Sequence, residues 1–461
     1  MTDSESEVLG AARAAVLMLR DRHQAGKTTD RLEILVGYSG GCDSVVLLDA
    51  LQSVAAGNAV GVTAMHVHHG LSPNADRWAD FCAEECSCRG IALVVRRVSV
   101  ARVAGESLEA AARAARYAAF ASAAADAIAL AHHADDQAET VLLQLLRGAG
   151  PHGLAAMPTF REDTRPVLMR PLLELPRSAL LEYAQRRNLR WIEDESNGDT
   201  QLRRNFLRHE IAPKLGATFP GYPATLARSA GHCAEAAELL DELAALDAAG
   251  ALPSDPDAPL TLDRARLRDL LHCSPARARN LLRWFLRRHG LQPPSTARLT
   301  AMLSQFDRAT EGARVRIEHA GSELGIFRGR ITVHAPAVQR FEATWRGEAE
   351  LSLPHGTLAF VPTSGNGIAT AKMRVATVTI RQRVGGERLK LGPDRPHRPL
   401  KKLLQDAAIA PWLRSSLPLV YCDGQLAAVP GIGVDAAFHP VAHEESVVLR
   451  WQPLVDSNGS S

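Results

Sequence analysis

The stretch from Leu35 to Leu51, LVGYSGGCDSVVLLDAL, constrains the fold of this 461-residue chain more than any other. An apolar run at 34–36 leads into the turn SGGCDS, and the apolar segment after it is too long and too regular for a loop. This order predicts a strand, a glycine-rich turn and a helix. Consecutive N–H groups in such a turn, together with the positive end of the helix dipole, form a site for an anion such as phosphate. An ordinary strand-to-helix turn has the same pattern, so other parts of the chain must show whether this turn binds an anion.

Short apolar runs recur along the first 215 residues, and long helical patterns separate them. They lie at 34–36, 62–67, 93–98 and 128–131. Strands that alternate with helices predict an α/β domain with a doubly wound parallel sheet. Ligands of such sheets lie beyond the carboxyl ends of the strands.

The alternation stops at the Gly- and Pro-rich segment 215–223, which indicates further domains. A mainly helical region is expected up to about residue 305, followed by short antiparallel strands in VRIEHAGSELGIFRGRITVHAP. The last region is smaller, α+β and rich in strands, and we expect it to end with a helix in KKLLQDAAI. The expected domains are 1–216, 222–335 and 340–455, which agrees with about 150 residues for each domain.

Composition excludes several classes of protein. With 46% hydrophobic and 23% charged residues the chain is globular, neither disordered nor membrane-embedded. Its start, MTDSESEVLG, lacks the basic and apolar regions of a signal peptide. The seven cysteines form no Cys-x-x-Cys pair, which favours reduced thiols in a cytoplasmic protein.

Basic residues are concentrated in two places, although the net charge is only +2. Between Arg381 and Arg414 nine Lys or Arg stand against three acids, among them Arg388, Lys401 and Lys402. An expected helix carries a second cluster: Arg277, Arg279, Arg283, Arg287 and Arg288. One such cluster would indicate a solvated face, whereas two in separate domains favour a nucleic-acid partner.

An acidic segment, AHHADDQAETVLLQLL, follows the fourth strand-like run. If a helix begins near Asp135, then Asp136 and Glu139 share a face, and His133 lies at the helix entrance. Such a group can bind a cation or an amine, or transfer protons. Acidic residues in the first turn can also serve only to stabilise the helix, through their interaction with its dipole.

Two further segments carry arginines at helical spacing. Glu109, Arg113, Arg116 and Phe120 fall on one face, where the arginines could bind phosphate or a developing negative charge, or form only a surface pair. The segments WIEDESN and RRNFLRHEIAPKL contain the polar residues Asp194, Asn197, Arg204 and Arg208. A region that only caps a helix would have a similar composition.

Histidines at 66, 68 and 69 follow the second strand-like run. No acid or cysteine lies nearby at a usual metal-ligand spacing, so nucleotide contact or packing is the preferred interpretation of His66.

Together these segments resemble a known family. SGGCDS resembles the pyrophosphate-binding loop of the PP-loop ATP pyrophosphatase superfamily. One member family, the tRNA(Ile)-lysidine synthetases, is similar over most of the chain. The similar strings are HVHHGL, LEAAARAARYAAF, AHHADDQAETVLLQLLRGAGPHGLAAM, RPLL, EDESN…RRNFLRHEIAPKL, RVGGERLKL and KKLLQDAAIAPWLRSSLPLVY.

The resemblance implies a fold and an activity. The fold is an adenine nucleotide alpha hydrolase-like domain. The enzyme adenylates the wobble-position cytidine of tRNA(Ile) with a CAU anticodon, and lysine then displaces AMP to give lysidine. ATP becomes AMP and pyrophosphate, and codon recognition changes from AUG to AUA. No membrane and no obligate protein partner are implied.

The resemblance also assigns roles to residues. Ser39, Gly40, Gly41, Cys42, Asp43, Ser44 and His66 would bind ATP, with Asp43 also near Mg²⁺. Asp136 and Glu139 would hold the lysine. Asp43, Arg113, His133 and Asp136 would form the catalytic group. Arg204, Arg208, Arg283, Arg287, Arg388, Lys401 and Lys402 would contact the tRNA.

Rival interpretations remain at this stage. A tRNA thiolase of the same fold is the nearest, but it needs a persulfide-carrying cysteine or an iron–sulfur site, which these cysteines do not suggest. A small-molecule synthetase would have no use for two basic appended domains. A non-catalytic RNA-binding protein would not need an intact SGGCDS and an acidic helix.

Overall fold

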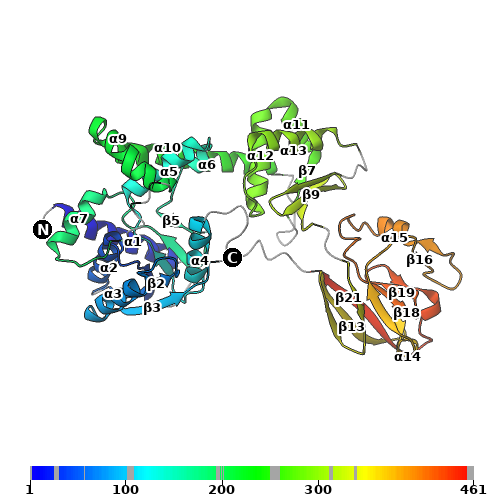
Figure 1. The fold of residues 1–461 in the computed structure, drawn as a ribbon. Coiled ribbons are helices and arrows are strands. Elements are labelled where there is room, and N and C mark those ends of the chain that lie inside the picture. Colours follow the sequence, from blue (N-terminus) through cyan, green and yellow to red (C-terminus); the bar gives the residue numbers. More distant parts are fainter. Residues whose placement is uncertain are drawn as a thin grey trace. The chain divides into compact units, whose positions relative to one another are not determined.

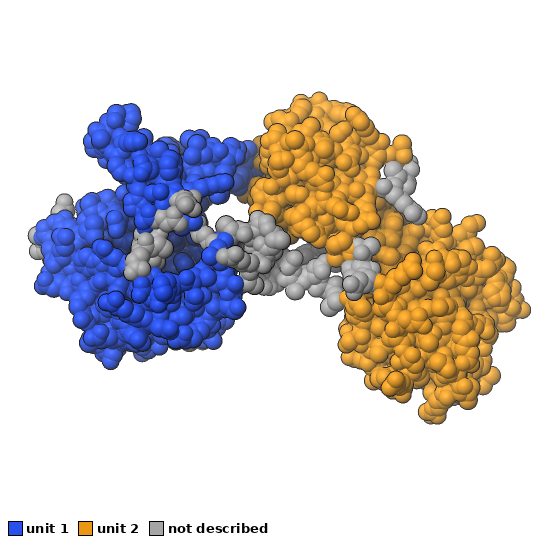
Figure 2. Space-filling view, in the orientation of Figure 1, with its two compact units in different colours: residues 1–240, 461 blue, residues 241–460 orange. Residues whose placement is uncertain are grey.

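The computed structural model describes most of the chain, and its residues form two compact units, Met1–Leu240 and Asp241–Ser460 (Figure 2). The described residues are 3–24, 31–56, 58–100, 108–162, 164–193, 198, 200, 202–249, 260–310, 315–336 and 340–453. This division falls inside one long helix, so the domain boundaries expected from the sequence stay predictions. Among the described residues, no helix combines the length and apolar character needed to cross a membrane.

The first unit is built on a six-stranded sheet with the order β3-β2-β1-β4-β6-β5 (Figure 1). Its strands are β1 Leu32–Gly37, β2 Val60–His68, β3 Ala92–Arg97, β4 Ala127–Ala129, β5 Phe160–Arg161 and β6 Val167–Met169. All pairings are parallel except that of β5 with β6. The predicted doubly wound sheet is confirmed, and the four predicted strands are β1 to β4.

The first unit also contains helices on both faces of this sheet, which explains why its inner strands β1 and β4 read as apolar runs. The helices are α1 Asp3–Gln24, α2 Cys42–Ala55, α3 Ala75–Cys88, α4 Leu108–Ala121, α5 Ala134–Leu146, α6 Pro151–Leu154, α7 Arg177–Arg186, α8 Arg203–Phe206, the π-helix η2 Leu207–Ile211, α9 Ala212–Thr218 and α10 Tyr222–Ala248. Successive strand residues point to opposite faces. Ile34 packs in the core formed with α1, α2, α3 and α7, whereas Leu35 packs with Phe120 of α4.

The second unit begins with three helices packed on a four-stranded antiparallel sheet of order β7-β10-β9-β8. These elements are β7 Leu262–Asp263, α11 Arg264–Cys273, α12 Pro275–Arg288, α13 Thr296–Arg308, β8 Arg316–His319, β9 Ser322–Phe327 and β10 Arg330–His334. Helices followed by antiparallel strands were predicted here, and α12 is the predicted arginine-rich helix.

The rest of the second unit is mainly strand. Its elements are β11 Glu342–Thr344, β12 Glu350–Leu353, β13 Gly356–Ser364, β14 Ile368–Ala369, α14 Thr370–Val375, β15 Val378–Arg381, β16 Arg388–Leu389, β17 Arg398–Pro399, α15 Leu400–Asp406, β18 Leu419–Cys422, β19 Gln425–Val429, β20 Gly433–Val434, η3 Ala436–Phe438 and β21 Glu445–Pro453. The prediction that this region ends with a helix is wrong. Four strands follow α15, and the longest of them, β21, pairs with β13.

Candidate active site

The turn between β1 and α2 has a conformation that requires glycine. Gly40 has φ +84°, and a Cβ atom there would lie 2.9 Å from Ile192 Cδ1 and 3.1 Å from Cys82 Sγ. Its carbonyl accepts a hydrogen bond from the Ile192 N–H at 3.0 Å. An alanine at this position would therefore combine backbone strain with a steric clash.

Two serines hold the turn in shape. The Ser44 hydroxyl donates to the Gly41 carbonyl at 2.9 Å and lies 3.1 Å from the Ser39 hydroxyl. The backbone N–H of Ser39 donates to Ser44 Oγ at 3.3 Å. Gly41 is the N-cap of α2, so the turn leads directly into the positive end of a 14-residue helix dipole. Within the loop, the Gly41 N–H also donates to Ser39 Oγ at 3.3 Å. The role of Ser39 to Ser44 in binding ATP stays a prediction.

The acidic helix begins one residue before the predicted start, with His133 as the N-cap of α5. The His133 N–H donates to Asp136 Oδ2 at 3.2 Å. The helix stops at Gly148, whose φ of +72° confirms the predicted end.

His133 connects the acidic helix to the loop. Its Nε2 lies 3.6 Å from Asp43 Oδ2 and 3.4 Å from Asp136 Oδ2, and its Nδ1 lies 3.5 Å from Asp135 Oδ2. Burial alone would lower the pKa of His133, but the contacts with Asp135 and Asp43 and the charge of Asp136 outweigh it and raise the pKa to about 9. The structure therefore brings three of the four predicted catalytic residues together: Asp43, His133 and Asp136.

Asp136 and Glu139, the predicted lysine-binding pair, are both ion-paired with arginines. Arg204 Nε donates to Glu139 Oε2 at 2.7 Å, and Arg208 Nε donates to Glu139 Oε1 at 2.7 Å. Both guanidinium groups also reach Asp136 Oδ1, at 3.2 Å and 2.9 Å. Burial would raise the pKa of Asp136, but His133 and Arg204 lower it.

These ion pairs connect residues that the resemblance assigned to two different ligands, lysine and tRNA. Arg204 and Arg208 are expected to contact tRNA, which stays a prediction, and in this structure they form ion pairs with Asp136 and Glu139. Arg208 lies on the π-helix η2, a rare conformation that is frequent at functional sites. A lysine ammonium would have to compete with these two arginines.

Arg113, the fourth predicted catalytic residue, is exposed on α4. Its Nη2 donates to the Tyr117 hydroxyl at 3.1 Å, and its guanidinium lies over the Tyr117 ring, 5.0 Å from the centroid. Burial lowers the pKa of His132 to about 3; the charge of Asp136 opposes this shift, and those of Arg170, Arg204 and Arg113 add to it. His132, Tyr117 and Arg170 had no predicted role, because nothing in their spacing indicates which partners they meet.

His66 is buried and makes its contacts within the protein. Its Nδ1 lies 3.0 Å from the Tyr38 carbonyl oxygen and 3.4 Å from Cys82 Sγ. Burial lowers the pKa of His66, so the ring is neutral near pH 7. The described residues contain no group of three or more His, Cys, Asp or Glu side chains that could hold a metal ion.

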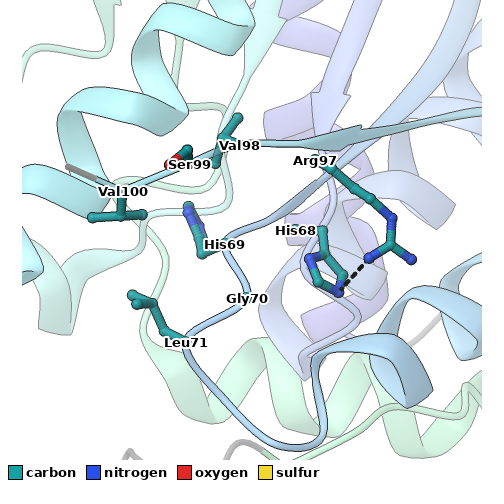
Figure 3. A pocket seen from close by; sticks show the side chains of 8 residues that line it. All are labelled: His68, His69, Gly70, Leu71, Arg97, Val98, Ser99 and Val100. Atoms are coloured by element: carbon teal, nitrogen blue, oxygen red, sulfur yellow. Dashed lines mark hydrogen bonds between the residues drawn. The ribbon is translucent and has the colours of Figure 1, made fainter.

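A pocket of about 480 Å³ opens where β2 and β3 end (Figure 3). The residues that line it are His68, His69, Gly70, Leu71, Arg97, Val98, Ser99 and Val100. Burial and the charge of Arg116 lower the pKa of His69 to about 4, so this ring is neutral. The pocket is at the sheet edge where doubly wound folds bind their ligands.

Comparisons with known proteins agree along the chain. Family models match residues 17–215 as a PP-loop domain, 266–332 as a TilS substrate binding domain and 378–451 as a TilS substrate C-terminal domain. The tRNA(Ile)-lysidine synthase of Nitrosomonas europaea is 43% identical over 433 residues, which covers 92% of each chain. That of Azoarcus sp. is 40% identical over 420 residues, or 90% of each chain.

The chain belongs to the tRNA(Ile)-lysidine synthase family. The resemblance inferred from the sequence is confirmed, and the PP-loop match implies that the protein uses ATP. Among solved structures, the U34-tRNA thiolase NcsA from Methanococcus maripaludis aligns with a TM-score of 0.38 and 16% identity, over 48% of this chain and 80% of that one. That likeness is too low to bear on function.

Three buried cysteines of the first unit have raised pKa values. Burial raises the pKa of Cys42 to about 11, of Cys82 to about 12 and of Cys86 to about 11. A thiol must lose its proton to act as a nucleophile.

We therefore expect these three cysteines to resist alkylation at pH 7.5. A pKa of about 11 leaves a thiolate fraction roughly 100-fold smaller than that of an ordinary cysteine. Mass spectrometry of protein treated with iodoacetamide should show rapid labelling of the exposed Cys88 and Cys273 and slow labelling of the buried set. Fast modification of Cys42 or Cys82 would contradict their protonated state.

Of the predicted tRNA contacts in the second unit, some are exposed and others are ion-paired. Lys401 and Lys402 are exposed on α15, and Arg388 is exposed and donates to the His397 carbonyl at 2.7 Å. Arg287 pairs with Asp241. Burial and the neighbouring Arg279 and Arg287 lower the pKa of Arg283. Asp194 and Asn197 lie outside the described residues, as does the side chain of Glu109.

Proposed function

We propose that this chain joins the ε-amine of L-lysine to C2 of the wobble cytidine of tRNA(Ile) with a CAU anticodon. ATP is converted to AMP and pyrophosphate, and the product, lysidine, changes codon reading from AUG to AUA. One observation carries the proposal: a loop shaped for pyrophosphate meets an acidic helix through His133, which contacts carboxylates of both.

In the first step the cytidine O2 attacks the α-phosphorus of ATP, and the bond from that phosphorus to pyrophosphate breaks. Backbone N–H groups of Gly40, Cys42, Asp43 and Ser44 receive the departing phosphates, whose charge the α2 dipole stabilises. Asp43 would hold Mg²⁺, because its Oδ1 is buried and has no hydrogen-bond partner among the described residues. Mg²⁺ accepts one protein carboxylate together with phosphate oxygens and water, and when bound it neutralises leaving-group charge.

In the second step the lysine amine attacks C2, and the bond from C2 to the oxygen of AMP breaks. Asp136 and Glu139 attract the lysine ammonium to this position, where a proton must leave before the nitrogen can attack. Arg204 and Arg208 already occupy both carboxylates. Lysine therefore takes over part of an existing set of charge-assisted hydrogen bonds. Arg113, on the exposed face of α4, steadies negative charge on the adenylated intermediate.

Basic side chains of both units hold the tRNA through its phosphates. Arg283, Arg287, Arg388, Lys401 and Lys402 are the proposed contacts in the second unit. Contacts of this kind fix the position of an RNA, whereas the base itself is read in the catalytic site. No membrane and no obligate protein partner are needed, and the proposed location is the cytoplasm.

Charge reversal at both Lys401 and Lys402 tests the phosphate contacts. Each phosphate contact that is lost lowers the slope of log affinity against log salt by about 0.7 to 0.9, so the double Glu variant should lower it by roughly 1.5. Titration of tRNA at several salt concentrations measures the slope. A slope equal to that of the natural chain would exclude both residues from the phosphate contacts.

One assay tests the activity as a whole. The purified full chain is incubated with unmodified tRNA(Ile), ATP and labelled lysine, and label in the tRNA is measured together with AMP. Lysine-dependent label with an equal amount of AMP is the expected result. Incorporation of sulfur from labelled cysteine would instead support a PP-loop tRNA thiolase.

A further inference from the structure

A second pocket, of about 360 Å³, lies between α5 and α8. Its lining is Leu143, Leu146, Arg147, Thr200, Arg203, Phe206 and Leu207. The set is apolar and basic and contains no acidic residue. Leu146 is 76% exposed and Phe206 is 45% exposed, so two large apolar side chains face solvent here.

The two arginines of this pocket differ from their neighbours on the same helices. Arg204 turns to Glu139 and Asp136, whereas Arg203, the preceding residue, forms no ion pair with an acid in the described part of the chain. The same holds for Arg147, the C-cap of α5. Two guanidinium groups without acidic partners beside an exposed aromatic ring match the composition of single-stranded nucleic-acid sites.

The pocket also lies close to the proposed reaction centre. Leu143 is four residues after Glu139 on α5, so the two side chains share a face of the helix. Leu146 is seven residues after Glu139, a distance of about 10 Å along the helix axis. A nucleotide next to the reacting one in the same strand can span this distance.

We propose that this pocket holds an unpaired nucleobase of the anticodon loop, next in the strand to the reacting cytidine. The base stacks on the ring of Phe206 and covers Leu146, while Arg147 and Arg203 contact the phosphates on either side. The assignment rests on the proposed function and adds a second base-binding position to it. An acidic or apolar protein partner is disfavoured, because the pocket is adjacent to the reaction centre and its charge suits phosphate.

Replacing Phe206 with alanine tests the stacking contact. Stacking of a base on an aromatic side chain contributes about 1–3 kcal/mol, so the Kd for unmodified tRNA should rise about tenfold, while the Kd for ATP stays unchanged. Phe206→Trp should retain affinity. Phe219→Ala is the matched control, because this ring is 61% exposed in the same unit and outside the pocket.

A tRNA that lacks the base on either side of the cytidine locates the contact. One of the two abasic tRNAs lacks the base that stacks on Phe206. The natural chain and Phe206→Ala should bind this tRNA with equal affinity, because the stacking contact is already lost. Leu146→Gln gives a second test that cannot disturb folding through the core, and it should weaken binding of the intact tRNA in the same direction.

Two results would overturn the assignment. One is a Kd for tRNA that is unchanged in both Phe206→Ala and Leu146→Gln, which would indicate that a protein partner occupies the pocket. The other is an equal loss with intact and abasic tRNA. Lysine-dependent AMP formation by the natural chain, measured in parallel, separates this failure from failure of the proposed function.

Discussion

Replacing Asp43 with alanine should reduce tRNA-dependent pyrophosphate release by about 10³-fold, the loss expected when a charge that stabilises the transition state is removed. Asp43 supplies one carboxylate oxygen with no hydrogen-bond partner among the described residues and another that lies 3.6 Å from His133 Nε2. The first oxygen suits a cation beside the departing phosphates, and the second lies beside the acidic helix. Because tRNA is held elsewhere, its Kd should change less than about twofold.

The measurement is pyrophosphate release together with tRNA binding, in the same preparation of the variant. Asp80→Ala provides the matched control, since Asp80 is an exposed carboxylate on α3 in the same unit. The control should retain both properties. Retention of pyrophosphate release by Asp43→Ala, or loss of tRNA binding, would contradict the proposed role.

Local sequence patterns predicted much of the catalytic fold. Continuous apolar runs located β1 to β4, and for β1 and β4 the reason is that strands buried on both faces need apolar residues at every position. The edge strand β3 is mostly exposed, and its run LVV was enough to locate it. Adjacent glycines located the turn in which Gly40 takes a positive φ. These features depend on neighbours within a few residues, and the sequence displays such neighbours directly. The strands β5 and β6, of two and three residues, were not predicted.

Long-range charge pairing could not be predicted in the same way. Helical spacing placed Arg204 and Arg208 on one face, but it does not say what that face meets. Their partner Glu139 is 65 and 69 residues away in the sequence. Arg287 and Asp241 are separated by 46 residues. In the sequence, a basic residue that binds phosphate cannot be distinguished from one that neutralises a buried carboxylate, because only the fold shows which partner lies close to it.

Replacing Glu139 with glutamine should separate the two chemical steps. The variant should keep tRNA-dependent exchange of labelled pyrophosphate into ATP, because the loop and Asp43 are unchanged. Transfer of lysine should fall by more than about 100-fold, because one of the two charges that attract the ammonium is lost. Exchange and lysine incorporation, measured over a range of lysine concentrations, report the two steps independently.

The same substitution also disturbs the structure, so a second variant is needed. Glu139 is 5% exposed and pairs with two arginines. Removing one partner of a buried ion pair costs about 3 kcal/mol of folding free energy. The cost is smaller here, because Arg204 and Arg208 are 25% and 30% exposed. Glu139→Gln with Arg204→Gln removes a charge of each sign and should recover part of the lost melting temperature. If lysine transfer returns together with stability, Glu139 acts only through packing. If stability returns while lysine transfer stays low, Glu139 binds the amino acid directly, which is the outcome that its position beside Asp136 leads us to expect.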